Sequence, residues 1–431
     1  MRSQAATLGV MVFSALAIRL LVTAFVFRSV AAPTIDHNEF GWEMGWTARS
    51  LVLGHGFASP FFPSTGPTAL VPPLYPYLLA LVFRLFGLYT AKSALIILSL
   101  NSVFSALTCL PIYFIAKHTL GQRAAQLAGW AWVLYPFAIY FSAGMVWDYA
   151  LTALLFCTCF WAAQRLHLHP RLITWAAFGA LFGVTALSNP SVVVTFPFLL
   201  LIAVLKVRQV DGRWLRNGLV TLLTFAAVLA PWTIRNYRTM HAVFPVRNGF
   251  WLEFWAGNNG DTSESNPAWA HPASNSVEMQ KYQASGEIAY FAEKRTLALN
   301  FVKHHPLFFA EVSARRALRF WTGFWSFNRA YLRREPFDVP NLFFCTGLTL
   351  LMLRGVGRWW RADRVTTLRY LILLGVFPLT YYLTHSSMDY RQPIEPEIVI
   401  LVTVGLFGLD EASQTPEESS EALSKDEMAR V

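Results

Sequence analysis

The chain has 431 residues, of which 55% are hydrophobic, 15% aromatic and only 14% charged, and its mean hydropathy is +0.40. This balance excludes an ordinary soluble globular domain and is typical of a protein that crosses a membrane several times. The formal net charge of +10 does not indicate a nucleic-acid partner, because the Lys and Arg residues lie mostly in short clusters between apolar runs, where membrane topology and lipid headgroups explain them.

Long apolar segments recur along the whole chain. A helix needs roughly 17 to 25 mostly apolar residues to cross the hydrocarbon core of a bilayer. About ten segments meet or approach this length, and the weakest is the short one near 341–353. The predicted spans lie near 8–30, 93–116, 124–143, 148–166, 172–188, 191–206, 217–234, 341–353, 366–384 and 396–410. The sequence therefore predicts an all-α polytopic membrane protein.

The positive charges of the short connections predict the orientation. If the ten spans alternate in direction, these charges fall on one side, which the positive-inside trend assigns to the cytoplasm. They are Lys117, Arg123, Arg165, Arg171, Lys206, Arg208, Arg213, Arg216, Arg354, Arg358, Arg361 and Arg364. We therefore expect a multi-pass protein of the inner (cell) membrane whose N- and C-termini are cytoplasmic and whose long connections are periplasmic or extracellular.

Two connections are much longer than the rest, and they divide the chain. An N-terminal transmembrane module, 1–234, contains the first long connection, 31–92, and an external helical region covers 235–340. C-terminal transmembrane helices follow in 341–410, and 411–431 is expected to be a disordered, acidic cytoplasmic tail. Long ordered connections are usually functional, so chemistry is expected on the external side.

Both long connections contain helical patterns. In the first, "FGWEMGWTARSLVLG" is amphipathic and ends at Gly54 and Gly56, while "PPLYPYLLALVFRLFG" is apolar but too short to span, so both are predicted to lie in the membrane interface. In the second, "VEMQKYQASGEIAYFAEKRTLALNFVKHHP" has helical periodicity and stops at Pro306.

Acidic residues are crowded after the first span. If the first loop helix extends back to Asp36, then Asp36, Glu39 and Glu43 share one helix face, and like charges so close raise the pKa of at least one carboxyl, as a general base near neutral pH requires. The same spacing is also compatible with an ordinary wetted helix face. Asp148, at the external mouth of the fourth span, is either a further acid of the site or a simple helix cap.

Cations on the external side depart from the positive-inside trend and call for an anionic partner. Arginine binds phosphate through forked, charge-assisted hydrogen bonds. The residues concerned are Arg235, Arg238, Arg315, Arg316, Arg319 and Arg391. Anchoring to lipid headgroups without a specific substrate is the alternative explanation.

Other common catalytic patterns are missing from the sequence. The four cysteines lie in apolar stretches and the histidines are dispersed, which gives no support to a disulfide framework or to catalytic zinc. No cofactor is implied with certainty. The clustered carboxylates would suit a divalent metal, Mg²⁺ or Mn²⁺, but the sequence leaves the metal unknown.

The motifs quoted above, together with "ARSLVLGHGF", "PWTIRNYR" and "YRQPIEP", resemble bacterial membrane glycosyltransferases of the GT-C superfamily, glycosyltransferase family 39. That family includes protein O-mannosyltransferases and the transferase that adds aminoarabinose to lipid A. The resemblance covers about residues 1 to 410. One departure is Val71 in "LVPPLYP", where the lipid A-modifying members have Lys, and it argues for a different acceptor.

The resemblance implies a GT-C-like fold, a polyprenyl-phosphate-linked sugar donor bound from the external side, and an essential acid in the first external loop. That role falls best to Glu43 or Glu39, with Asp36 weaker, and Asp148 resembles the second acid of the family. The implied phosphate-binding arginines are Arg235 and Arg391, with Arg316 and Arg238 as further candidates. The resembling motifs also contain Tyr75, Asn236 and Tyr390, which we expect to contact substrate.

The resulting hypothesis is an inverting hexosyl- or pentosyltransferase. The first-loop carboxylate takes a proton from an acceptor hydroxyl, which attacks the anomeric carbon while polyprenyl phosphate leaves. The acceptor would be a lipid, a glycan or a protein, and membrane lipids surround the chain. The alternatives are a transporter or flippase of an anionic lipid or solute, which predicts buried ionisable residues at mid-span, and a non-catalytic scaffold.

Overall fold

The structure is a computed structural model, and it describes residues 2–34, 36–62, 64–168, 171–208, 212–260, 270–324, 329–334 and 338–408. Throughout this part of the chain the secondary structure is helical, apart from an isolated β-bridge between Ala58 and Pro67. The predicted tail, 411–431, lies outside the described residues.

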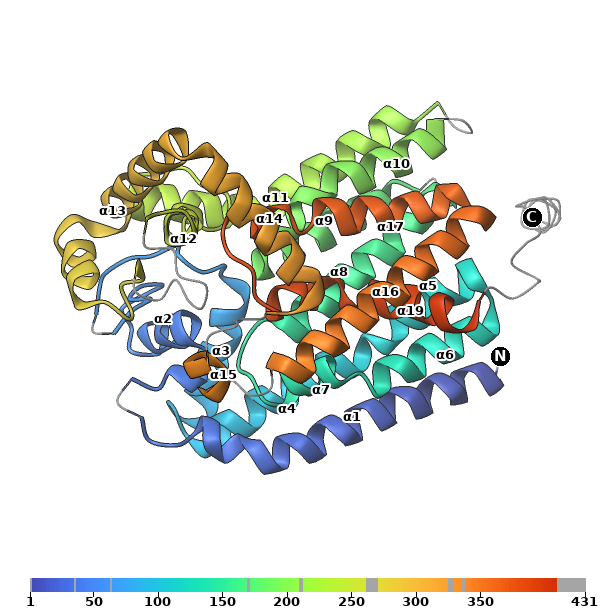
Figure 1. Cartoon of the computed structure of the whole chain (residues 1–431), viewed down its shortest axis with the longest axis horizontal. Coiled ribbons are helices and arrows are strands. Elements are labelled where there is room, and N and C mark those ends of the chain that lie inside the picture. The colour runs from blue at the N-terminus through green and yellow to red at the C-terminus, as the bar shows by residue number, and fades with distance from the viewer. Residues whose placement is uncertain are drawn as a thin grey trace.

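The helices follow one another with short connections except in the two long segments (Figure 1). The α-helices are α1 (Arg2–Val30), α2 (Trp42–Val52), α3 (Leu74–Phe86), α4 (Ala91–Leu107), α5 (Cys109–Leu120), α6 (Gln122–Val133), α7 (Pro136–Ala143), α8 (Tyr149–Arg165), α9 (Leu172–Ser188), α10 (Phe196–Arg208), α11 (Trp214–Met240), α12 (Phe250–Gly257), α13 (Ser276–His304), α14 (Pro306–Thr322), α15 (Arg329–Arg334), α16 (Asp338–Ala362), α17 (Arg364–Val376), α18 (Leu379–Leu383) and α19 (Glu395–Phe407). The 3₁₀ helices are η1 (Asn38–Phe40), η2 (Leu166–Leu168), η3 (Pro190–Thr195) and η5 (Asp389–Ile394).

Every predicted span coincides with a helix or a pair of helices, so the all-α polytopic fold is confirmed. Six helical stretches of the described chain are long and apolar enough to cross a membrane, and they are Gln4–Val30, Ala91–Leu120, Pro190–Arg208, Trp214–Met240, Asp338–Ala362 and Arg364–Leu383. The predicted span near 124–143 is instead broken between α6 and α7, because Pro136 cannot donate a backbone hydrogen bond to a continuing helix. The segment near 341–353 was predicted to be the shortest span, but it belongs to α16, which is long enough to cross a membrane.

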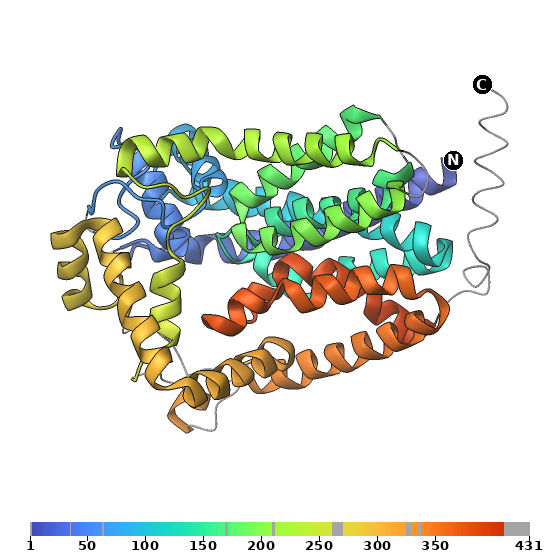
Figure 2. The same cartoon turned by 90° about the horizontal axis from the view of Figure 1, so that it is seen from above.

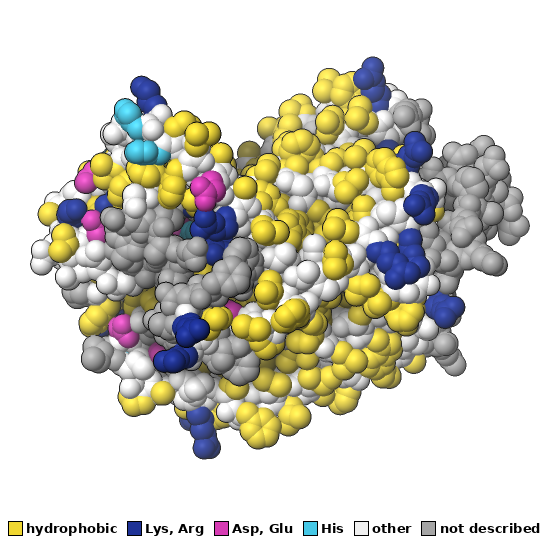
Figure 3. Space-filling model, in the orientation of Figure 1, with side chains coloured by type: hydrophobic (Ala, Val, Ile, Leu, Met, Phe, Trp, Pro, Cys, Tyr) yellow, Lys and Arg dark blue, Asp and Glu magenta, His cyan; other side chains and the backbone are white. Residues whose placement is uncertain are grey.

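The long helices run side by side, and the two long connections gather at one end of the bundle (Figures 1 and 2). We call this the loop end, defined by α2, α3, α12 and α13. The N-terminus lies at the opposite, terminal end. Figure 3 shows an apolar surface over the middle of the molecule, with Lys and Arg side chains along the terminal end. This arrangement agrees with the predicted grouping of the loops. That the terminal end faces the cytoplasm remains a prediction.

Inside the bundle, Arg19 of α1 is fully buried beside the break between α6 and α7. Its guanidinium donates to Ser105 Oγ at 2.8 Å and to the carbonyl oxygens of Trp132 and Val133 at 3.1 and 3.2 Å. These carbonyls lie at the C-terminal end of α6, where the partial negative charge of the helix attracts a cation. Arg19 therefore stabilises the break between α6 and α7, and its positive charge has a structural role there.

The first long connection differs from the prediction at its start. α2 begins at Trp42 and does not extend back to Asp36, because His37 and Gly41 are in the left-handed region with φ of 52° and 99°. A Cβ atom on Gly41 would lie 2.9 Å from the carbonyl oxygen of Val146, so this turn requires glycine. The expected single helix face with three acids is therefore wrong. The two other loop helices are confirmed as α3 and α13, the latter with a kink at Gly286.

Candidate active site

Glu43 lies in the first turn of α2, at the loop end, with 13% of its side chain exposed. Its Oε1 atom is 3.5 Å from Nε2 of His271, which belongs to the second long connection. Burial raises the pKa of the Glu43 carboxyl, and the charges of His271 and Arg247 oppose that increase. A largely buried carboxylate with a raised pKa, next to an imidazole nitrogen, has the properties of a general base.

Asp148 lies beside the same region because Val146 packs against Gly41. It is 1% exposed, and Thr152 donates to its Oδ2 atom at 2.8 Å, while its Oδ1 atom is buried without a hydrogen bond. The Asp148 side chain caps no backbone N–H of α8, so the simple-cap explanation does not describe its contacts.

Arg247 is the cation of this region. Its Nη2 atom is 3.4 Å from Oε1 of Glu253 on α12, and its charge also acts on Glu43 and Asp148. About 30% of the Arg247 side chain and 28% of the Glu253 side chain remain exposed. The charges of His385 and Arg247 lower the pKa of the Glu253 carboxyl despite the opposing effect of burial, so Glu253 is ionised near neutral pH.

His385 completes the arrangement. Its Nδ1 atom is 3.6 Å from Oε2 of Glu253, and its Nε2 atom is 2.6 Å from the Tyr390 hydroxyl. The Tyr390 ring stacks on Tyr381, and the neighbouring Asp389 accepts a hydrogen bond from Tyr149. We name the residues linked by these contacts and charges the loop-end cluster. It comprises Glu43, Asp148, Arg247, Glu253, His271 and His385.

The other two first-loop acids lie outside the cluster. Glu39 is exposed on η1 and accepts a hydrogen bond from Thr34 at 2.9 Å. Asp36 is half-buried and accepts one from Asn38 at 2.7 Å. Of the three carboxylates singled out in the sequence, the structure therefore brings only Glu43 together with Arg247 and two histidines.

Among the predicted phosphate-binding residues, those at the end of α11 contact the protein itself. Arg235 donates to the carbonyl oxygens of Thr68 at 2.6 Å and Phe57 at 2.5 Å. Asn236 is fully buried and donates to Phe244 O at 3.2 Å. Arg235 thus attaches the first long connection to α11, and Asn236 attaches the start of the second. Arg238, one turn further, is exposed.

The remaining two predicted arginines are buried. Arg316 of α14 donates to Gly257 O and, at 3.1 Å, to Asn258 Oδ1. Arg391 is 2% exposed and forms an ion pair with Glu395, with Nε and Oε1 2.5 Å apart. Both guanidinium groups are thus engaged within the protein, although the charge of Arg316 also acts on His385 of the loop-end cluster.

Of the predicted substrate-contacting tyrosines, Tyr75 is fully buried, is hydrogen-bonded to Asn101, and is close enough to Asp148 for the carboxylate to act on its hydroxyl. Tyr390 contacts His385, as described above. Both therefore border the loop-end cluster.

Sequence reasoning missed Arg247, Glu253, His271 and His385 as members of the site. Arg247 follows α11 by a few residues, so the argument from external cations applied to it as well. Glu253 is an isolated acid in the aromatic segment "FWLEFWAG", which is an unusual place for a charge. His271 gives no local signal, because only the fold brings it to Glu43.

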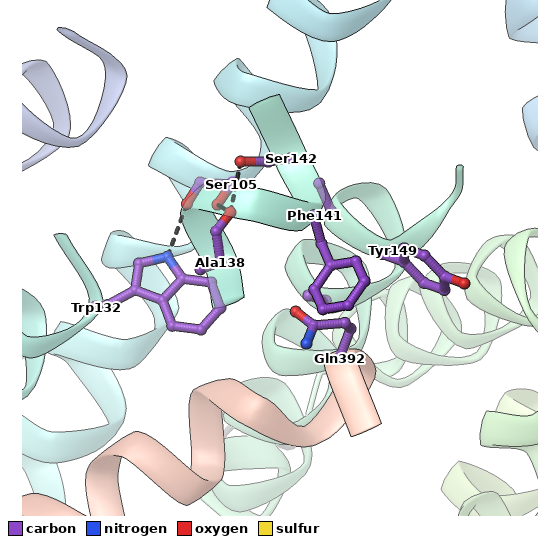
Figure 4. A pocket seen from close by; sticks show the side chains of 9 residues that line it. Ser105, Trp132, Ala138, Phe141, Ser142, Tyr149 and Gln392 are labelled. Carbon is purple, nitrogen blue, oxygen red and sulfur yellow. Dashed lines mark hydrogen bonds between the residues drawn. The ribbon is translucent and has the colours of Figure 1, made fainter. Parts of the chain in front are cut away.

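A small hollow lies within the helix bundle (Figure 4). Its empty volume is about 200 Å³, and Ser105, Trp132, Phe141 and Gln392 are among its lining residues. The Tyr149 ring borders the hollow while its hydroxyl bonds to Asp389, so the hollow adjoins the loop-end cluster but is too small to hold a sugar phosphate.

Comparisons with known proteins agree with this architecture. Residues 70–234 match the family model described as dolichyl-phosphate-mannose-protein mannosyltransferase. A comparison of the sequence with curated proteins gave no match.

Among solved structures, the fold is similar to that of the oligosaccharyltransferase of Archaeoglobus fulgidus. The crystal structure of its complex with Zn and sulfate superimposes with a TM-score of 0.54 and 11% identity, over 93% of this chain and 48% of that one. The apo form gives a TM-score of 0.54 and 13% identity, over 98% of this chain and 52% of that one.

The chain spans about half the length of these structures. At such low identity the likeness concerns the fold alone. The predicted resemblance to GT-C membrane glycosyltransferases is confirmed by the family model over residues 70–234, and the fold of nearly the whole chain is similar to that of the archaeal oligosaccharyltransferase.

Proposed function

We propose that this membrane protein is a glycosyltransferase that moves a sugar from a polyprenyl-phosphate-linked donor to a hydroxyl group of an acceptor, with inversion at the anomeric carbon. The observation that carries the proposal is that Glu43, a largely buried carboxylate with a raised pKa, lies at the loop end together with Arg247 and Asp148. The matched family, named for a lipid-phosphate-linked sugar donor, supports the donor class.

In the proposed mechanism Glu43 is the general base. It accepts the proton of the acceptor hydroxyl while that oxygen forms a bond to the anomeric carbon. The bond between the anomeric carbon and the phosphate oxygen breaks at the same time, and the electron pair leaves with polyprenyl phosphate. A sugar phosphate ester already carries a good leaving group, so the protein has to position the reactants, remove a proton and stabilise charge.

Arg247 is the proposed partner of the departing phosphate. Its guanidinium is partly exposed, and its contact with the carboxylate of Glu253 is long at 3.4 Å, which leaves donor groups free for a phosphate. The earlier candidates Arg235, Arg316 and Arg391 hold backbone carbonyls or an internal carboxylate. We therefore assign them the task of fixing the loops and the bundle around the donor.

Whether a divalent metal takes part is open to test. Within the described residues, no three His, Cys, Asp or Glu side chains are grouped closely enough to hold a metal ion. The steps above use Glu43 and Arg247, and the metal dependence of the enzyme is a matter for direct titration with Mg²⁺ and Mn²⁺.

One observation supports the alternative function, a transporter. Glu397 in the first turn of α19 is fully buried, and a buried ionisable residue within a bundle often marks a transport path. A single assay separates the two functions. The detergent-solubilised protein is incubated with a set of polyprenyl-phosphate monosaccharides and a mixture of hydroxyl acceptors, and released polyprenyl phosphate is measured. Transfer predicts release with at least one sugar, whereas a transporter leaves every donor intact.

A further inference from the structure

The two nitrogen atoms of His271 have different partners. Its Nδ1 atom accepts a hydrogen bond from the backbone N–H of Ala273 at 3.3 Å. Its Nε2 atom faces Oε1 of Glu43 at 3.5 Å. A neutral imidazole carries one N–H, and an atom that accepts a hydrogen bond cannot carry it. The proton of neutral His271 therefore lies on Nε2, the atom that points to Glu43.

The ring of His271 is held in this orientation from the first long connection. The edge of Phe61 meets it with ring centroids 5.2 Å apart and an interplanar angle of 88°. Phe61 is itself 1% exposed and packs in the same manner against Tyr282 of α13, at 5.0 Å. Residues of both long connections thus fix which atom of the imidazole Glu43 meets.

We propose that His271 is a positioning residue whose Nε2 atom, 3.5 Å from Oε1 of Glu43, orients that carboxylate and favours its ionised form. This rests on the proposed function, because it gives Glu43 the role of base. His271 does not carry the substrate proton in this scheme, since protonation of Nδ1 would break the hydrogen bond from Ala273. The ring acts as a fixed donor.

The charged groups around Glu43 determine how the removal of the His271 side chain should change the protonation of Glu43. Arg247 and His271 face it from the second long connection, Glu253 faces it from α12, and α2 itself contributes no other ionisable group within its first turn. A hydrogen bond donated to a carboxylate favours its ionised form. Without the imidazole, Glu43 would stay protonated up to a higher pH, and the base would be lost over a wider acidic range.

The test compares His271→Ala with His271→Gln in the full-length protein in detergent, with His55→Ala as the control. His55 is exposed in the first long connection and lies outside the loop-end cluster. The readout is the pH dependence of kcat/KM for transfer from a polyprenyl-phosphate sugar. We expect the acidic limb of His271→Ala to move up by about one pH unit, whereas His271→Gln, whose side-chain amide can also donate, keeps an acidic limb close to that of the wild type and of the control.

Two results would overturn the proposal. An unchanged acidic limb in His271→Ala would show that the imidazole does not act on the base, and a loss of activity at all pH values in His271→Gln, equal to that of His271→Ala, would assign His271 to proton transfer instead. Should His271→Ala fail to fold, the profile of His271→Gln still decides between these roles. The parallel Glu43→Gln variant separates a failure of the His271 proposal from a failure of the proposed function, because full activity of this variant would show that Glu43 is not the base.

Discussion

Gly41 packs directly against the carbonyl oxygen of Val146, and this contact brings Glu43 and Asp148, each two residues further along the chain, to the same end of the bundle. The turn at Gly41 has φ of 99°, which non-glycine residues adopt only with strain. The geometry of the acids thus depends on one glycine between η1 and α2.

Gly41→Ala should therefore reduce both stability and transfer. The left-handed backbone alone costs about 1–2 kcal/mol for a residue with a Cβ atom, and the clash with Val146 adds to this and displaces Glu43. Gly54→Ala is the matched control, because Gly54 also has a positive φ, of 83°, but a Cβ there meets open space. Thermal unfolding and transfer rates in detergent should show a larger loss for Gly41→Ala. Equal effects of the two changes would contradict the proposed contact.

Glu39→Gln and Asp36→Asn should leave transfer within about threefold of wild type. Their carboxylates bond to nearby side chains and lie outside the loop-end cluster, so neither is placed to meet the acceptor. Surface changes of this kind usually alter stability by less than about 0.5 kcal/mol. Initial rates at saturating donor measure the effect, and a hundredfold loss in Glu39→Gln would transfer the role of base to that residue.

The pH dependence should reflect the raised pKa of Glu43. Its base form is the ionised one, so kcat/KM should fall as the pH drops through a value above the ordinary 4.5 of a glutamate. The contribution of Glu43 to stability changes with pH in the opposite direction to its contribution to activity. Because the folded protein binds this proton more tightly than the unfolded chain does, the contribution of Glu43 to the free energy of unfolding decreases as the pH rises from 4.5 through the folded pKa. An acidic limb at or below 4.5 would contradict the assignment.

Arg247 and Arg391 should differ when each is changed to Ala. Loss of a charge-assisted contact to phosphate should weaken donor binding by about 1.5–3 kcal/mol, or roughly ten- to a hundredfold, in Arg247→Ala, with little effect on folding. Arg391→Ala leaves Glu395 buried without its cation, which typically costs about 3–5 kcal/mol of stability. Donor titration and thermal unfolding of both variants distinguish the roles. A normal donor affinity in Arg247→Ala would remove it from the phosphate site.

The sequence predicted the bundle well because span length and apolar composition are local properties that the bilayer requires of each helix. The break at Pro136 was less visible, since the flanking residues are apolar on both sides. The start of α2 was predicted wrongly, because the left-handed turns at His37 and Gly41 depend on distant contacts that local periodicity does not record. Gly41 packs against Val146, and the His37 ring stacks on Tyr89.

The site was predictable only in part. Glu43 and Asp148 stand out as acids next to spans, whereas the pairing of Glu43 with His271 depends on two distant loops. The sequence likewise could not show which partners the arginines have in the folded protein. Charge on the unexpected side identified Arg235 and Arg391, but it could not show that backbone carbonyls and Glu395 already engage them. Arg247 differs from these two arginines because in the folded protein it lies next to Glu253 and its charge acts on Glu43.

The most direct measurement of the central claim is the release of polyprenyl phosphate from a polyprenyl-phosphate sugar by wild-type protein and by Glu43→Gln, each shown to be folded by its thermal unfolding transition. Removal of a general base typically lowers a rate by about 10²–10⁴-fold. We expect release by the wild type and a loss of that size in Glu43→Gln, with donor affinity retained. Equal rates of release by the two folded proteins would contradict the account.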